Sequence, residues 1–315
     1  MKRLLFCLLP ILAYAHPGIG IVKDSKGIIY YSDLQQVWKI ENGLKTIAVP
    51  GVHSHELYMD SADNLYGEHV IYKDEGANVF QHYLWVLKSN GSFDTVLGPK
   101  QAYLLDDYSL ARDRNGAEYF MKRFPRQIDT THLYKRWPDG RETVFATGNF
   151  KGITWLHPQG DGSLLYILNN NVYRVSPAGG VTCLAKGIGN TKPSFAFSKN
   201  NITTWGAWED TAKNVYVAVF SDQTVRKIDS AGNISDYYRS AGHWTPIHGV
   251  FDNAGQLWVL ESSDINEVRV VQAGALLQKG LTMHKAPWLI VGFGILALAG
   301  LWFWKQKPSR KRLLL

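Results

Sequence analysis

Short runs of alternating apolar and polar residues recur along most of the chain, separated by turns rich in aspartate and glycine. Each repeat begins with D-x-x-G or a close variant, continues into an apolar or aromatic run, and reaches a second glycine turn. Alternation with a period of two is typical of half-buried β-strands, and no amphipathic helical stretch lies between the runs. The first turns of the repeats begin at Asp24, Asp60, Asp113, Asp210 and Asp252, with a degenerate copy from Pro158 to Asn169.

The second half of the repeat gives the number of units. It recurs six times at spacings of 39 to 53 residues, beginning at Val37, Leu84, Leu133, Val172, Val225 and Val268. Units of about 40 to 50 residues with four short strands are typical of β-propeller blades. Closing the blades in a ring removes the exposed edges that an open sheet would leave. The pattern therefore predicts an all-β fold, a six-bladed β-propeller over residues 16–275.

The repeat resembles the NHL-repeat branch of six-bladed propellers, whose unit runs from a glycine through D-x-D-G-N and an apolar-tyrosine pair to a D-G turn. Gly20-Ile-Val-Lys-Asp24 and Trp137-Pro-Asp-Gly140 match this unit, and the resemblance covers about residues 17–275. The departures are Glu56 and His248, which stand at the glycine position of blades two and six, and a poorly matched fourth blade. The superfamily also holds gluconolactonase-like and peptidylglycine-lyase-like propellers, so the resemblance implies a fold and leaves the function open.

The first fifteen residues have the order of a secretory signal peptide. Lys2 and Arg3 precede an apolar run, and Ala13-Tyr14-Ala15 supplies the small residues of an A-x-A cleavage site. The run is too short to cross about 30 Å of hydrocarbon, so cleavage before His16 is favoured over an uncleaved anchor. The mature chain then keeps a single cysteine, Cys183, which excludes an internal disulfide.

A second apolar segment lies near the carboxyl end. Residues 288–304 carry no charge, and at about 1.5 Å per residue they rise about 26 Å, nearly the thickness of the hydrocarbon layer. Five bases follow directly within residues 305–315. The positive-inside rule then predicts a transmembrane helix with a cytoplasmic tail, preceded by a linker over residues 276–287. The propeller would lie on the extracytoplasmic side of the cell membrane, periplasmic or extracellular.

The distribution of charge excludes one class of partner. The 315-residue chain has 34 bases and 27 acids, a net charge of +7. Eight of the bases lie in residues 1–15 and 285–315, which contain no acid, so residues 16–284 hold 26 bases and 27 acids. A body with a net charge of −1 lacks the positive surface that nucleic-acid binding requires. We therefore expect no nucleic-acid partner.

Histidines and carboxylates are predicted to gather at one mouth of the axial channel. In a propeller the innermost strand begins at one mouth and the second strand returns to it. The residues expected at this mouth are those at the start of an innermost strand or at the end of a second strand. They are His55 and Glu56 of blade two, His248 of blade six, and His69 and Glu261 from second strands. Imidazoles from separate blades suit zinc or another divalent transition metal. We predict His55, His69 and His248 as metal ligands, with Glu56 or Glu261 as the catalytic base.

The resemblance bears on this site as well. Peptidylglycine-type lyases of the superfamily bind zinc through histidines of alternating blades, which implies His55 and His248 as ligands here. The fourth blade offers no histidine at the matching place, because His157 falls about two residues out of phase. Polar residues also collect at a channel mouth simply because water enters it, so a purely structural interpretation stands beside the metal site.

These patterns leave three hypotheses. The first is a membrane-anchored extracytoplasmic propeller that binds a small molecule or a protein at its channel mouth. The alternative is a metal-dependent hydrolase or lyase, lactonase-like or peptidylglycine-lyase-like, with its site at that mouth. The third is an assembly scaffold that uses the faces of its blades. Residues 16–284 contain no P-loop, dinucleotide-binding, serine-hydrolase or C-x-x-C redox motif.

Overall fold

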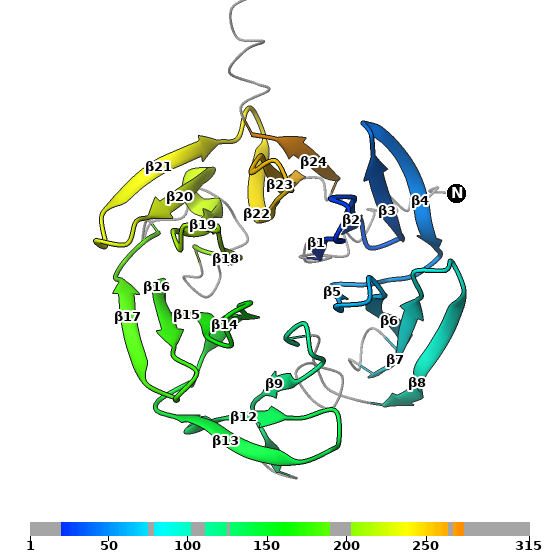
Figure 1. Ribbon diagram of the computed structural model, residues 1–315, viewed down its shortest axis with the longest axis horizontal. Coiled ribbons are helices and arrows are strands. Elements are labelled where there is room, and N and C mark those ends of the chain that lie inside the picture. The colour runs from blue at the N-terminus through cyan, green and yellow to red at the C-terminus, as the bar shows by residue number, and fades with distance from the viewer. Residues whose placement is uncertain are drawn as a thin grey trace, which may run out of the picture. The chain divides into compact units, whose positions relative to one another are not determined.

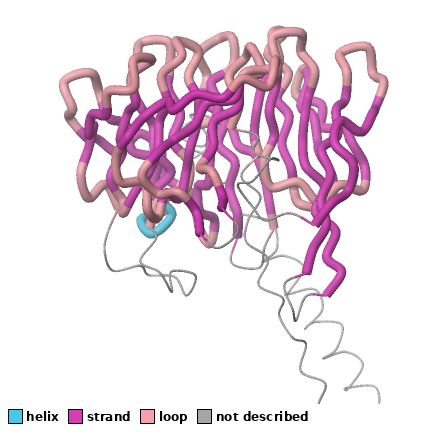
Figure 2. Tube along the Cα trace, turned by 90° about the horizontal axis from the view of Figure 1, so that it is seen from below, coloured by secondary structure: helices cyan, strands magenta, loops and turns pink. Residues whose placement is uncertain are grey.

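Six antiparallel sheets stand around a central axis and form the blades of a β-propeller (Figure 1). The computed structural model describes residues 20–74, 79–101, 111–124, 127–189, 203–263 and 267–273. In the side view the strands run between two layers of turns (Figure 2). The prediction of an all-β, six-bladed propeller is confirmed.

The first three blades follow one another along the chain, and in blades one and two the first strand lies nearest the axis (Figure 1). Blade one contains β1 (Ile21–Lys23), β2 (Ile29–Ser32), β3 (Gln36–Glu41) and β4 (Leu44–Pro50). Blade two contains β5 (Leu57–Met59), β6 (Leu65–Asp74), β7 (Val79–Leu87) and β8 (Phe93–Gln101). Blade three contains β9 (Glu118–Phe120), β12 (His132–Arg136) and β13 (Glu142–Thr147), and an isolated bridge joins Arg112 to Glu118 on the inner side of β9.

The remaining blades repeat this order. Blade four contains β14 (Ile153–Pro158), β15 (Leu164–Leu168), β16 (Asn171–Val175) and β17 (Val181–Ala185). Blade five contains β18 (Ala207–Glu209), β19 (Val215–Val219), the short helix η1 (Phe220–Asp222), β20 (Thr224–Ile228) and β21 (Ile234–Arg239). Blade six contains β22 (Trp244–Phe251), β23 (Leu257–Ser263) and β24 (Val268–Gln272). Within the described ranges, blades three and six thus have three strands, and β10 (Arg123–Phe124) and β11 (Gln127–Ile128) form a separate small sheet.

The predicted signal peptide, linker, transmembrane helix and basic tail lie outside the described residues. In the part of the chain that the structure describes, no helix is long and apolar enough to cross a membrane. The chain divides into two compact units, residues 1–273 and 274–315, and the propeller belongs to the first.

One carboxylate organises the first turn of most blades. Asp252 Oδ1 accepts hydrogen bonds from the backbone N–H groups of Ala254 and Gln256, both at 2.9 Å, and Oδ2 accepts one from Trp258 Nε1 at 2.9 Å. Donors two, four and six residues after the aspartate recur in other blades. Asp60 accepts from Ala62, Asn64 and Tyr66. Asp113 accepts from Asn115, Ala117 and Tyr119. The aspartate and the aromatic residue six positions later recur in the sequence because they are partners in this turn.

Asp210 shows what these turns contribute to stability. Its carboxylate accepts bonds from the backbone and side-chain amides of Asn214 at 2.9 and 2.7 Å and from the Tyr216 hydroxyl at 3.0 Å. Burial acts to raise the pKa of Asp210, but the hydrogen bonds outweigh it and the pKa lies below its ordinary value. The folded chain therefore binds this proton less readily than the unfolded chain, whose carboxyl has a pKa of about 4.

We expect the stabilisation by Asp210 to be present above about pH 4 and to be lost as the pH falls below it. Asp210→Asn should be less stable than the natural protein at neutral pH and should lose less stability on acidification, because the amide does not titrate. Urea unfolding of both proteins across this pH range measures the difference. Equal acid losses in the two proteins would contradict the assignment.

Apolar clusters fill the spaces between neighbouring blades. Trp155 of blade four packs with Val217 of blade five in one cluster. Leu260 of blade six joins Ile29 and Tyr31 of blade one in another, and this contact closes the ring. Because each of these two clusters draws on two blades, the positions of those blades depend on the side chains of their neighbours.

Candidate functional site

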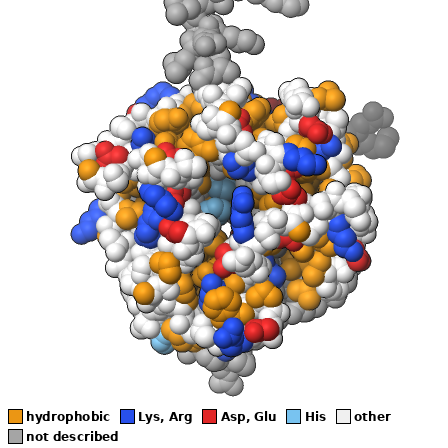
Figure 3. All heavy atoms as spheres, in the orientation of Figure 1, with side chains coloured by type: hydrophobic (Ala, Val, Ile, Leu, Met, Phe, Trp, Pro, Cys, Tyr) orange, Lys and Arg blue, Asp and Glu red, His pale blue; other side chains and the backbone are white. Residues whose placement is uncertain are grey.

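A cavity of about 810 Å³ opens at the turn end of the channel, the end at which the first turns of the blades lie. All six blades contribute to its wall, through residues 21–23, 57–59, 112–114, 157–160, 208–211 and 248–255, and Tyr216 and Tyr237 complete it. Figure 3 shows the centre of this face hollowed, with histidine and basic side chains in the hollow. The volume lies within the range of small-molecule sites, about 300–1,000 Å³.

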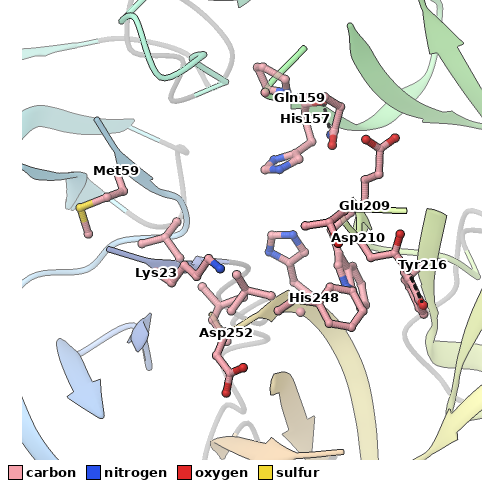
Figure 4. Close-up of a pocket in the computed structure, with 18 of the residues that line it drawn as sticks. Lys23, Met59, His157, Gln159, Glu209, Asp210, Tyr216, His248 and Asp252 are labelled. Carbon is pink, nitrogen blue, oxygen red and sulfur yellow. Dashed lines mark hydrogen bonds between the residues drawn. The ribbon is translucent and has the colours of Figure 1, made fainter. Parts of the chain in front are cut away.

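Two histidines meet in this cavity. His157 comes from β14 and His248 from β22, and their ring centroids are 5.7 Å apart. Figure 4 shows the two imidazoles pointing toward one another. The indoles of Trp155 and Trp208 lie edge-on to His248, with centroid distances of 4.7 and 5.5 Å. The cavity therefore combines groups that can transfer protons with aromatic surface.

A glycine in blade five allows this cluster to form. Four residues before the first turn, blades four and six carry Trp155 and His248, whereas blade five, between them, carries Gly206. The Gly206 N–H donates to the carbonyl oxygen of Ile247 at 2.9 Å. A Cβ at Gly206 would stand 2.6 Å from that oxygen and 2.9 Å from His248 Cδ2. Because blade five has no side chain here, the Trp155 indole also reaches its backbone and donates to the Ala207 carbonyl at 3.0 Å.

A smaller cavity of about 40 Å³ shares part of the same wall. Glu56, Trp155, His157 and His248 are among the residues that line it. Of the five predicted site residues, the structure therefore brings Glu56 and His248 together. His157 also lines this cavity, although its position in the repeat, about two residues out of phase, argued against it as a ligand.

Burial lowers the pKa of His157 to about 4, because a protonated imidazole loses its hydration inside the channel. At neutral pH His157 is therefore uncharged, and one ring nitrogen is available as a proton or hydrogen-bond acceptor. An unfolded histidine has a pKa of about 6.5, so the unfolded chain takes up this proton first. The neutral imidazole thus contributes stability that is lost as the pH falls from about 6.5 toward 4.

We expect NMR titration of the full-length protein to give an imidazole pKa near 4 for His157. His157→Phe should assign the signal by removing it, and should reduce the loss of stability between about pH 6.5 and pH 4. Titration of the natural residue near its ordinary value of about 6.5 would show that water hydrates the ring freely.

The other two predicted histidines lie in a hydrogen-bonded group of blade two. His55 Nδ1 lies 3.2 Å from Glu68 Oε1, and His55 Nε2 lies 3.2 Å from His53 Nε2. The His53 backbone N–H donates to His69 Nδ1 at 3.0 Å, and burial lowers the pKa of His69. The structure therefore joins His55 to His69 through His53. It does not place either of them in the wall of the cavity that contains His248.

Glu261 connects two blades. It is fully buried, its Oε1 accepts a hydrogen bond from the Tyr238 hydroxyl at 2.7 Å, and its Oε2 accepts one from Arg269 Nε at 2.7 Å. Tyr238 lies on β21 of blade five and Arg269 on β24 of blade six. Both oxygens of this predicted base are thus engaged by donors from other strands, and neither cavity is lined by it.

The predicted zinc ligands do not form a shared site as the structure places them. Across the described residues, no three His, Cys, Asp or Glu side chains are grouped so that they could hold a metal ion. His55 and His69 belong to the group in blade two, whereas His248 lies beside His157 and the two indoles. The side chains that line the cavity carry imidazole, carboxylate and cationic groups.

Several residues of the cavity were not singled out from the sequence as one site, namely Lys23, Arg114, His157 and Trp208. A signal for His157 was present. His157 stands two residues before its turn and His248 four residues before its own, and residues two apart on a strand share a face. Both imidazoles therefore point to the same side of their strands.

Comparison with known proteins supports the fold. No protein-family model and no curated protein matches the chain. Among solved structures, an auxiliary nutrient binding protein from Bacteroides ovatus superimposes with a TM-score of 0.52 at 12% identity, covering 81% of this chain and 69% of that one. A putative gluconolactonase gives a TM-score of 0.51 at 12% identity, covering 81% and 88%. A streptogramin B lyase gives 0.50 at 10% identity, covering 81% and 93%.

These identities establish a shared architecture and no more. The chain shares its propeller fold with these structures, as the sequence repeats predicted. Because propellers of one architecture perform unrelated functions, the function must be argued from the cavity itself.

Proposed function

We propose that the protein is an exported β-propeller, held at the membrane by the helix predicted over residues 288–304, and that its turn-end cavity binds a small molecule. The observation that carries this proposal is the cavity of about 810 Å³, to which all six blades contribute. Two imidazoles and a set of aromatic rings line it. Concave sites of this size with few convergent polar groups are where proteins bind small ligands.

Two turn alanines provide a matched test of cavity binding. Ala254 lines the mouth of the cavity in blade six, and Ala212 holds the same place in the turn of blade five without lining it. Both are exposed. Ala254→Trp should obstruct the cavity, whereas Ala212→Trp adds the same indole outside it.

The full-length natural protein should retain a small molecule in equilibrium dialysis against a low-molecular-weight extract of its source cells, read by mass spectrometry. We expect Ala212→Trp to retain the same compound and Ala254→Trp to lose at least nine-tenths of it, since an indole occupies a sizeable part of the opening. Retention of the compound by both variants, or by none of the three proteins, would overturn the proposal.

The anchor is tested by cell fractionation. Deletion of residues 288–315 should move the protein from the membrane fraction to the soluble extracytoplasmic fraction, because the remaining chain has no other apolar run of that length after signal cleavage. Persistence of the truncated protein in the membrane would contradict anchoring by this segment.

A second candidate function is hydrolysis or elimination, and the meeting of His157 with His248 is the observation that favours it. A neutral imidazole can take a proton from a substrate, and a neighbouring imidazole can return one to the leaving group. Elemental analysis of the purified full-length protein and of its His55→Ala/His248→Ala variant decides whether zinc takes part. Stoichiometric metal that is lost in the variant would support a metal-dependent enzyme, and a metal-free active protein would leave the imidazoles as the catalysts.

A further inference from the structure

The acidic side chains in the wall of the turn-end cavity are held by donors of the protein itself. Asp113 pairs with Lys135 at 3.2 Å, and Glu209 pairs with Lys213 at 2.8 Å. Asp252 accepts the three hydrogen bonds of its own turn, and Figure 4 shows its carboxylate pointing away from the two imidazoles. The negative charges of the wall are therefore engaged by the protein's own donors.

Two of the cations in the wall differ from these acidic side chains in their interaction partners. Lys23 Nζ donates to Asn253 Oδ1, a neutral amide oxygen, at 3.0 Å, and Figure 4 shows the side chain extending into the cavity. Arg114 is exposed at the rim, and its side chain forms no ion pair with any residue that the structure describes. Arg112, by contrast, pairs with Glu118 at 3.5 Å. Lys23 and Arg114 thus bring positive charge to the cavity without a carboxylate partner.

These two cations act on one another. Burial and the charge of Arg114 lower the pKa of Lys23, and together they outweigh the attraction of Asp252. Asp63 is also near Arg114, but its two oxygens already accept hydrogen bonds from the backbone and hydroxyl of Ser25 at 2.8 and 2.5 Å. An anion bound between Lys23 and Arg114 would offset their repulsion.

An aromatic surface lies in the same wall. Tyr237 of β21 is 45% exposed although it is a large aromatic residue, and its ring lies 4.9 Å from that of Tyr216. The Tyr216 ring in turn lies 4.8 Å from Phe251. Exposed rings packed edge-to-face against buried ones form a rigid platform on which a flat apolar group can stack.

We propose that the ligand of the turn-end cavity is an organic anion whose carboxylate or phosphate group binds to Lys23 and Arg114. Its aromatic or apolar body lies against the rings of Tyr237 and Phe251. This inference rests on the proposed function, since it names the chemical class of the ligand that the same cavity takes. It assigns recognition to charge-assisted hydrogen bonds at one part of the wall and to stacking at another.

Three small probes separate these contributions. 1-Naphthoate carries the anion and the ring, 1-naphthamide keeps the shape without the charge, and 1-naphthyl phosphate replaces the carboxylate with a phosphate. We expect the full-length protein to bind at least one of the two anions about tenfold or more tightly than the amide in calorimetric titration. The anion that binds more tightly identifies the acid group of the ligand. Affinity for it should fall as salt is added, because the site is open to solvent.

Variants that each remove one positive charge show where the anion binds. Lys23→Met and Arg114→Met should each weaken binding of the preferred anion about tenfold or more, with little change for the amide. Lys26→Met removes a lysine from the turn next to Lys23, outside the cavity wall, and should leave the affinity within about twofold. Tyr237→Ala should weaken binding of all three probes, since each carries the ring. All variants are measured in one detergent, so partition of the probes into micelles cancels.

The failure of this inference is distinguishable from failure of the proposed function. Equal binding of anion and amide, unchanged in Lys23→Met and sensitive to Ala254→Trp, would overturn the anionic ligand and leave a cavity that binds neutral molecules. Binding of none of the three probes would also overturn it, and the proposed function would then stand or fall on the dialysis experiment. Loss of anion binding in Lys26→Met to the same extent as in Lys23→Met would show that the overall charge of the face, not these two cations, attracts the anion.

Discussion

Gly206→Ala is expected to lower the free energy of unfolding by about 1–3 kcal/mol, the usual cost of adding an atom to a closely packed contact. The new Cβ would stand 2.6 Å from the Ile247 carbonyl oxygen, a backbone atom that cannot rotate away. Blades five and six must then move apart, which stretches the 2.9 Å hydrogen bond between the Gly206 N–H and that oxygen. Because His248 Cδ2 lies 2.9 Å from the same Cβ position, the imidazole should also be displaced.

Gly160→Ala is the control for this substitution. Gly160 lies in the turn of blade four, and a Cβ there would meet no atom within 4 Å. We expect its stability to stay within about 0.5 kcal/mol of the natural protein. Thermal or urea unfolding of the two variants gives the comparison, and the NMR signals of His248 report the displacement. Equal stability of Gly206→Ala and Gly160→Ala would show that the blades are not in the contact described.

Trp208→Ala should have the largest effect on stability, about 3–5 kcal/mol. The indole is 3% exposed and packs in the cluster that joins blades five and six. It stacks on Tyr216 with a centroid distance of 6.3 Å and meets the edge of His248 at 5.5 Å. Its removal would leave a large void between two blades and would withdraw one side of the support for His248.

Trp208→Phe separates packing from hydrogen bonding. Trp208 Nε1 is buried and has no hydrogen-bond partner among the described residues, so phenylalanine removes no bond and leaves no donor unsatisfied. We expect it to cost less than half as much as alanine. Similar losses for the two substitutions, in urea unfolding of the full-length protein, would mean that the indole nitrogen makes a bond that the described contacts lack.

The number of blades could be predicted from the sequence because each repeat contains hydrogen bonds between residues that are close together in the chain. In the first turns, the aspartate bonds to groups two, four and six residues ahead, so the residues that define the turn stand close together in the chain. Asp252 and Trp258 illustrate this, since their hydrogen bond spans six residues. Such contacts leave a pattern that a single sequence displays.

The site could not be predicted as well, because it depends on contacts between blades. Glu261 has a suitable phase for a channel mouth, but Tyr238 and Arg269, from other strands, engage both its oxygens. The approach of His157 to His248 depends on the space left by Gly206 in the intervening blade. Contacts of this kind join residues of different strands, up to about 90 positions apart, and follow no repeat.

The position of the retained compound tests most directly whether the turn-end cavity binds the ligand of this protein. A crystal structure of the full-length protein with that compound should show it in the turn-end cavity beside His157 and His248, in contact with Lys23 and with the rings of blades five and six. A compound seated instead beside His55 at the start of blade two, or on the outer strands of the blades with the turn-end cavity empty, would contradict the account.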